Sequence, residues 1–205
     1  MKRGYMELQN GMTLVEVIIY TAVFGLVMLA VGNGVALLYK SNAYTIAQAY
    51  QVQYARRGVQ AMVRDIREMT FADDGTFPLA RMEDNLIGFY SDIDRDDSVE
   101  YVEYELEAST QLTKRIYNAT GSPVTYNTVT ADETLILSEY AQNLIMGTST
   151  FSYYDTNGNL ATSTTGVTDI RYVQVRPIIN VDPIRSPGQF ELRSSAALRN
   201  VMDNL

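Results

Sequence analysis

The chain has 205 residues, enough for one globular domain and a long additional helix. Aspartate and glutamate outnumber lysine and arginine by 24 to 16, and the resulting formal charge of −8 argues against nucleic acid as the main ligand. The sequence contains no histidine, which excludes a histidine-based catalytic triad or metal site, and no cysteine, which excludes disulfide bonds.

The first long element is an apolar segment, 12–40, in which Glu16 is the one charged residue before Lys40. A helix rises about 1.5 Å per residue, so about 20 apolar residues reach across the roughly 30 Å hydrocarbon core of a bilayer. The segment 12–40 therefore predicts a membrane-spanning helix.

A short polar leader, 1–11, precedes this helix and carries Lys2 and Arg3. Basic residues favour the cytoplasmic side, so we expect a cytoplasmic leader and an exported C-terminal part. A secretory signal peptide would have a shorter apolar core, followed by a cleavage site of small residues. The apolar segment of this chain is too long for that interpretation and continues into more helix.

A single carboxylate in such a segment needs an explanation, because a charge placed deep in a bilayer costs about 3 kcal/mol or more. One possibility is that Glu16 lies at the level of the headgroups, where water solvates it. The other is a partner of opposite charge. If the chain is cut after Gly11, the new ammonium group of Met12, from the same or a neighbouring subunit, lies about one helical turn from Glu16.

The segment from Gly11 to Glu16, followed by the apolar helix, resembles the class III signal of type IV prepilins and pseudopilins. In that family a prepilin peptidase cuts after the glycine and methylates the new N-terminal residue, and the glutamate guides docking into a filament. The resemblance implies that Gly11 is the cleavage residue, Met12 the methylated terminus and Glu16 the assembly acid. It covers residues 1–40, and the family more often has phenylalanine at the position of Met12.

Three glycines interrupt the apolar helix, at Gly25, Gly32 and Gly34. Each costs about 1 kcal/mol relative to alanine in a helix interior, which makes these positions weak points. Small residues also allow helices to pack closely, and both interpretations suit a filament. The resemblance implies that part of this segment loosens when a subunit is assembled, and we expect the loosening between Gly25 and Gly34.

The helix is predicted to continue beyond Lys40, since the next proline is Pro78. Apolar residues recur there at spacings of three to five, while most charged residues, Asp65 among them, lie off that face. The apolar face comprises Ile46, Tyr50, Tyr54, Val59, Met62, Val63, Ile66 and Met69.

The sequence thus predicts one helix from Thr13 to about Phe71, ended by the turn Asp73–Gly75. Its second half, 41–72, is expected to pack against a β-rich head formed by 73–205.

Alternating apolar and polar residues predict strands in the head. They are expected at Leu86–Tyr90, Val99–Leu106, Gln111–Asn118, Thr134–Leu137, Thr150–Tyr154, Asp169–Arg176 and Gln189–Arg193. In the second strand valine and tyrosine alternate with glutamate, so one face is expected to face water. The loop Thr156–Thr168 is expected to be mobile. A helix followed by a meander of antiparallel strands predicts an α+β head with the helix on one sheet face, which is also the arrangement of the pilin fold.

Parts of the head resemble PilW-like minor pilins and the larger minor pseudopilins of type II secretion. The resemblance rests on the hairpin Phe89–Asp94, on Ile170–Val175 and on the closing residues Leu198–Asn200. It implies a minor subunit that primes assembly or lies at the filament tip, although a major subunit remains an alternative.

An acidic segment, Asp92–Glu103, has the oxygen spacing of a calcium-binding EF-hand loop. The candidate ligands are Asp92, Asp94, Asp96, Glu100 and Glu103. Asp97 stands where an EF-hand has glycine, and the flanking strands could turn Glu103 away. The alternative is a solvated acidic turn. A weaker second set comprises Asp155, Asn157 and Asn159, next to an Asn-Gly turn signal.

No motif predicts an enzyme, because the acidic segment shows no apolar pocket that would tune an acid or a base. We expect a pilus or pseudopilus subunit whose partners are other pilin subunits, the prepilin peptidase and, before assembly, the inner membrane. The assembled filament is expected to be extracellular or periplasmic. The alternatives are a type II secretion minor pseudopilin and a membrane-anchored calcium- or ligand-binding module that does not polymerise.

Overall fold

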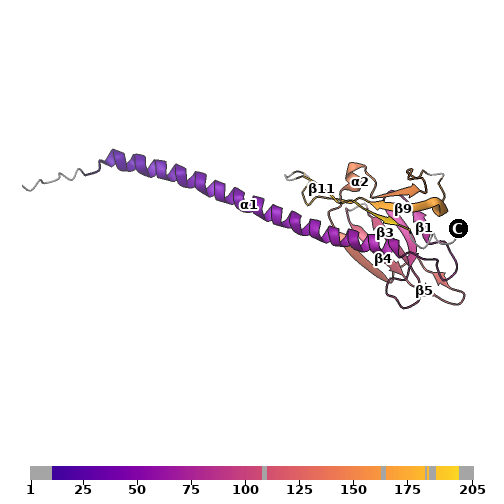
Figure 1. Ribbon diagram of the computed structural model, residues 1–205. Coiled ribbons are helices and arrows are strands. Elements are labelled where there is room, and N and C mark those ends of the chain that lie inside the picture. Colours follow the sequence, from indigo (N-terminus) through magenta and orange to yellow (C-terminus); the bar gives the residue numbers. More distant parts are fainter. Residues whose placement is uncertain (1–10, 108–109, 163–164, 183, 185–187, 199–205) are drawn as a thin grey trace, which may run out of the picture. The chain divides into compact units, whose positions relative to one another are not determined.

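A computed structural model describes residues 11–107, 110–162, 165–182, 184 and 188–198, and Figure 1 shows its ribbon. The predicted leader residues 1–10 and the residues Arg199 and Asn200 of the closing pattern lie outside this range. The chain divides between Ile46 and Ala47 into two units, which are treated separately below.

The elements are, in chain order, α1 (Leu14–Arg67), β1 (Leu79–Met82), β2 (Leu86–Ser91), β3 (Glu100–Leu106), β4 (Leu112–Tyr117), β5 (Ala119–Thr120), β6 (Thr125–Tyr126), β7 (Glu133–Ser138), α2 (Asn143–Met146), β8 (Phe151–Asp155), η1 (Val167–Asp169), β9 (Ile170–Val175), β10 (Ile178–Ile179), β11 (Phe190–Glu191) and β12 (Ser194–Ala197). One long apolar helix followed by antiparallel sheets confirms the α+β class.

The N-terminal end of α1 is capped by Thr13. Its hydroxyl oxygen accepts a hydrogen bond from the Glu16 backbone N–H at 3.3 Å, and its carbonyl oxygen accepts one from the Val17 N–H at 3.2 Å. These are the interactions expected of a threonine that stands three residues before a glutamate at a helix start. The helix therefore begins one residue later than Thr13, the first helical residue predicted.

The helix runs without a break through Gly25, Gly32 and Gly34. Within the described part of the chain, a Cβ atom added at any of these glycines would meet nothing within 4 Å. The surface beside them is therefore free for another chain. The expected loosening concerns an assembled subunit and stays a prediction.

The second half of α1 packs on the head through Val59, Met62 and Ile66, all at most 5% exposed. Together with Phe89 and Tyr104 they belong to the main core cluster. This confirms that an apolar face of the helix lies on the sheet.

The prediction is wrong for the N-terminal residues of the apolar face. Ile46, Tyr50 and Tyr54 are 48%, 59% and 60% exposed, and Val52 and Ala55 are buried instead. The five-residue step from Tyr54 to Val59 breaks the helical period, so residues before it cannot share a face with those after it.

The helix ends at Arg67 rather than near Phe71. The Thr70 N–H donates to the Tyr90 carbonyl oxygen at 2.9 Å, so the chain joins strand β2 where the helix was expected to continue. The expected turn does form after that, and Gly75 adopts a φ of 84° within it.

A five-stranded antiparallel sheet has the order β1-β2-β3-β4-β7. Phe89 lies opposite Val102, and Val102 opposite Ile116. Strands β2, β3, β4 and β7 lie where they were predicted, to within one residue. Strand β1 was missed, because only four residues separate Pro78 from the turn before β2.

The remaining strands do not extend this sheet, so the expected single meander is wrong. Strands β12, β9 and β8 form a separate three-stranded sheet, and β10 pairs with β11. The last predicted strand is reduced to Phe190–Glu191, and β12 was missed because Ser194–Ala197 lacks large β-forming side chains. Residues 163 and 164 of the predicted mobile loop lie outside the described residues.

Strand β3 does not have the wet face that its glutamates predicted. Glu100 and Glu103 are only 5% and 6% exposed. Arg81 forms an ion pair with Glu103 at 2.7 Å, and the Tyr101 and Tyr117 hydroxyls each lie 3.4 Å from its carboxylate. The glutamates that alternate with apolar residues in β3 therefore include buried, hydrogen-bonded side chains, not only solvated ones.

Buried tyrosines predict a loss of stability at alkaline pH. Burial raises the pKa of Tyr104, and likewise the pKa of Tyr101 and of Tyr153, above the ordinary value of 10.0. Below pH about 10 these phenols are protonated in both folded and unfolded chains, so their contribution is complete. Above it only the unfolded chain ionises, and the free energy of unfolding falls. Urea denaturation between about pH 8 and about pH 11, followed by circular dichroism, should show a steadily lower midpoint. An unchanged midpoint would contradict this.

Candidate functional site

The N-terminal candidate residues lie at the start of α1. Gly11 and Met12 are exposed and precede the helix, and Met12 is 63% exposed. Glu16 lies in the first turn, and the Tyr20 hydroxyl lies 3.4 Å from its carboxylate. The predicted cleavage position therefore lies in an exposed segment without secondary structure, directly ahead of the helix.

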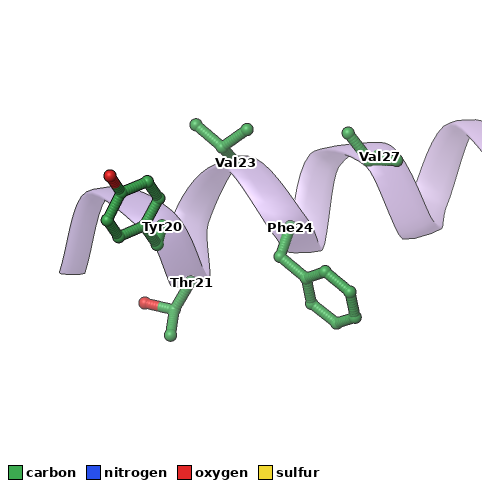
Figure 2. Close-up of a pocket in the computed structure, with 5 residues that line it drawn as sticks. All are labelled: Tyr20, Thr21, Val23, Phe24 and Val27. Carbon is green, nitrogen blue, oxygen red and sulfur yellow. The ribbon is translucent and has the colours of Figure 1, made fainter. Parts of the chain in front are cut away.

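The surface that follows is apolar. By length and composition, α1 can cross a membrane. Figure 2 shows part of this surface, lined by Tyr20, Thr21, Val23, Phe24 and Val27. The Thr21 hydroxyl lies 3.0 Å from each of the carbonyl oxygens of Val17 and Ile18, so the helix itself satisfies this polar group.

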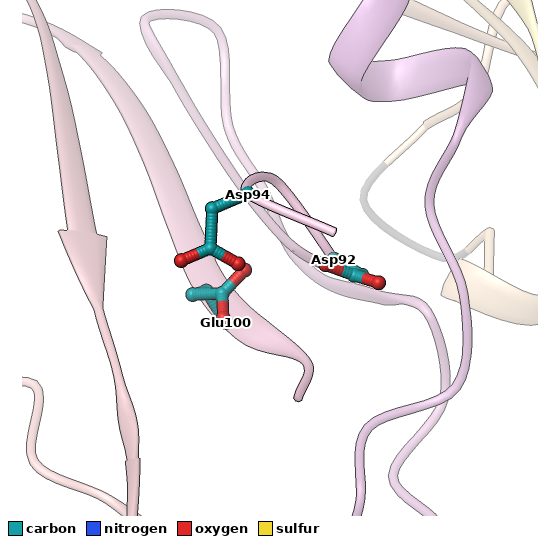
Figure 3. A group of neighbouring side chains, drawn as sticks. All are labelled: Asp92, Asp94 and Glu100. Carbon is teal, nitrogen blue, oxygen red and sulfur yellow. The ribbon is translucent and has the colours of Figure 1, made fainter. Parts of the chain in front are cut away.

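The acidic segment brings three of its predicted ligands together. One carboxylate oxygen from each of Asp92, Asp94 and Glu100 lies within 4.8 Å of the other two (Figure 3). Glu100 is the first residue of β3 and is buried, whereas the two aspartates belong to the loop after β2. Three carboxylates at this spacing could contribute oxygen ligands to a hard cation.

Backbone groups already use part of these oxygens. The Ile93 N–H donates to Glu100 Oε2 at 2.8 Å and the Arg95 N–H to Asp92 Oδ1 at 2.6 Å. Burial raises the pKa of Glu100, the charges of Asp94 and Asp92 add to this, and the Ile93 N–H opposes it. A bound cation would favour the ionised carboxylates and so reverse the effect of burial.

Asp96 and Glu103 do not join this group. Asp96 Oδ1 accepts a hydrogen bond from the Ser98 N–H at 2.8 Å. Glu103 is three residues from Glu100 on one strand, so it projects from the opposite face, toward Arg81. Asp97, at the position of the EF-hand glycine, adopts a φ of 71°, a conformation that favours glycine.

Two other acidic residues, Asp132 and Glu133, share a pocket with Asp94 and Glu100, and sequence spacing missed them. A pocket of 240 Å³ is lined by Asp94 and Glu100 and also by Asn118, Asp132 and Glu133. Asn118 follows β4, Asp132 precedes β7 and Glu133 is the first residue of β7. The pairing of Ile116 with Glu133 places them next to one another. Only the pairing of β4 with β7 brings these residues to the site, and the spacing of residues within one segment does not reveal that pairing.

The weaker set around Asp155 forms a self-contained turn. Asp155 Oδ1 accepts hydrogen bonds from the N–H groups of Asn157 and Asn159, both at 2.8 Å, and the Asn159 side chain donates to Oδ2 at 3.2 Å. The backbone hydrogen bond from Asn159 contributes most to lowering the pKa of Asp155. These bonds account for the local structure without a metal.

A buried ion pair in the head was also missed. Lys114 Nζ lies 2.7 Å from Asp65 Oδ2, and the Tyr104 hydroxyl donates to the same oxygen at 2.7 Å. The lysine and aspartate side chains are 8% and 2% exposed. The sequence of β4 did contain a signal. Lys114 lies two residues from both Leu112 and Ile116, so its side chain is on the same buried face of the strand.

Calcium binding stays a prediction, and its test is direct. Millimolar calcium should raise the melting temperature of the purified protein, because a ligand that binds the folded state stabilises it by mass action. Asp94→Asn should weaken the response, and Asp155→Asn should leave it unchanged. Equal responses of the three proteins, or no response at millimolar calcium, would contradict a calcium site at Asp92, Asp94 and Glu100.

A scan against protein-family models finds no match to this chain, and a search of the curated proteins finds no match either.

Proposed function

We propose that this chain is a structural subunit of a type IV pilus or pseudopilus. It is cut after Gly11, is anchored through 12–40 and assembles with Glu16 as its assembly acid. The observation that carries the proposal is a helix whose exposed surface from Leu14 to Tyr39 is apolar apart from one acid and a few uncharged polar groups, preceded by the accessible Gly11.

An apolar surface of this extent requires a cover, because soluble monomers rarely expose large contiguous apolar patches. Before assembly the bilayer supplies it, and in a filament the equivalent helices of other subunits supply it. In either environment Glu16 needs a polar partner, since an unpaired charge in apolar surroundings is costly. The ammonium group of Met12, created by the cut, is that partner in the filament.

The head then lies on the far side of the membrane from the leader and is carried on the filament. Its resemblance to minor pilins favours a priming or tip position. A minor pseudopilin of type II secretion is the alternative. Finding the protein in a surface pilus would favour the pilin, and finding it in a type II secretion pseudopilus would favour the pseudopilin.

A membrane-anchored calcium- or ligand-binding module is the second candidate, favoured by the cluster of Asp92, Asp94 and Glu100. Such a module would retain residues 1–11 and behave as a single species in detergent. A pilin subunit would lose them.

Intact mass measurement of the protein purified from its own membrane tests the proposal. The expected mass lacks residues 1–11 and carries one additional methyl group. A Gly11→Val variant should keep the full mass, because a side chain at the cleavage position obstructs the peptidase. Mature protein that still begins at Met1 would contradict the proposed processing.

A further inference from the structure

Glu16 is partly covered although it lies on a bare helix. From Gly11 to Ala43 it is the one residue that is partly buried. Tyr20 stands four residues later, on the same helix face, and its hydroxyl lies 3.4 Å from Glu16 Oε1. Figure 2 shows the Tyr20 ring reaching back toward the N-terminal end of the helix, the direction in which helical side chains lean.

The other local options for the carboxylate are not taken. At a helix start of this sequence type, the glutamate side chain often bonds back to the backbone N–H of the capping residue, here Thr13. Among the described residues, the Glu16 backbone N–H donates to the Thr13 hydroxyl instead, and the Glu16 side chain makes no hydrogen bond to the Thr13 N–H. The Thr21 hydroxyl faces the carbonyl oxygens of Val17 and Ile18. Tyr20 is therefore the side-chain donor that meets the acid.

We propose that Tyr20 is a positioning residue for Glu16. Its hydroxyl donates to the carboxylate and its ring covers it, so that the acid has a partner inside the membrane before a neighbouring subunit supplies an ammonium group. This inference rests on the proposed function, in which Glu16 is the assembly acid.

The ammonium group of Met12 can replace the Tyr20 hydroxyl as the partner of Glu16, because the ammonium is charged and the hydroxyl is not. A hydrogen bond to an ionised acceptor is stronger than one between neutral groups, and water is scarce in the bilayer core. A phenol leaves the negative charge of Glu16 in place, so the incoming ammonium of Met12 still gains a full ion pair. Tyr20 thus holds the carboxylate in place for the incoming ammonium group without satisfying the acid completely.

The contact can be observed directly with 3-fluorotyrosine at position 20 in the full chain, reconstituted in lipid nanodiscs. The fluorine resonance reports the environment of the phenol hydroxyl, so Glu16→Ala should shift it. The same label at Tyr39, which has Val35 rather than an acid four residues before it, is the matched control and should not respond. A position-20 resonance that ignores Glu16→Ala would overturn the proposed contact.

The effect on assembly is measured with Tyr20→Phe, which removes only the hydroxyl. We expect at least about tenfold less of this variant in filaments at normal cleavage, because the carboxylate loses the hydrogen bond that holds it in place for the ammonium group, and a hydrogen bond to a charged group is worth about that much. Tyr39→Phe should assemble normally, and equal behaviour of the two variants would overturn the positioning role. Normal incorporation of Glu16→Ala would instead contradict the proposed function, so the two failures are distinct.

Discussion

A Glu16→Ala subunit is expected to be cut and methylated normally and to be absent from filaments. The substitution lies five residues after the cleavage position and leaves Gly11 and Met12 unchanged. It removes the one negative charge of the apolar surface, so the ammonium group of Met12 loses its partner in apolar surroundings. Comparing the subunit content of membranes and sheared filaments by immunoblot measures the result.

Two controls make this experiment specific. Glu68→Ala removes an exposed acid from the other unit, where its carboxylate lies 3.8 Å from Arg95, and should not alter incorporation. Glu16→Gln keeps the shape of the side chain without its charge and should resemble Glu16→Ala. Normal incorporation of both position-16 variants would disprove the assembly role of the charge.

Asp65→Ala is expected to lower the free energy of unfolding of the head by about 3–5 kcal/mol. The loss leaves Lys114 as a buried ammonium without its carboxylate partner and takes the acceptor from the Tyr104 hydroxyl. A charge left uncompensated in a core is much more costly than the ion pair is favourable. Urea denaturation of the full chain in detergent, followed at the head's tyrosine fluorescence, gives the value.

The partner substitutions separate charge from packing. Tyr104→Phe removes one hydrogen bond to the Asp65 carboxylate but leaves the ion pair intact, so it should cost less, about 1.5–3 kcal/mol. The double variant Asp65→Leu with Lys114→Met replaces the pair with apolar groups of similar volume and should recover most of the stability. A double variant as unstable as Asp65→Ala would show that shape, not the unpaired ammonium, caused the loss.

Local pattern was enough for much of this molecule. The apolar segment and the glycine before it are close together in the sequence, so a helix with an acid at its start could be predicted. The same holds for β2, β3, β4 and β7, because alternation of side chains is a property of a few neighbouring residues.

Features that depend on pairing between distant segments could not be predicted in this way. The pocket next to Glu100 includes Asp132 and Glu133 only because β4 pairs with β7. The covered face of β3 likewise depends on Arg81, which strand β1 places beside Glu103. Helical phase was the third limit, since one five-residue step left Tyr50 and Tyr54 on the wrong face.

One long-range contact constrains the order in which this protein matures. The side chain of Gln48 accepts a hydrogen bond from the Val181 N–H at 2.9 Å and donates to the Ile179 carbonyl oxygen at 3.3 Å, closing a loop of more than 130 residues. Strand β12 similarly reaches back to the end of α1, where Arg67 donates to the Ser195 carbonyl oxygen. Native contacts of such high sequence separation slow folding, because a long loop must close before they form. A chain that is still held at its C-terminal strand during synthesis lacks these contacts, so the head is completed only after β12 is released.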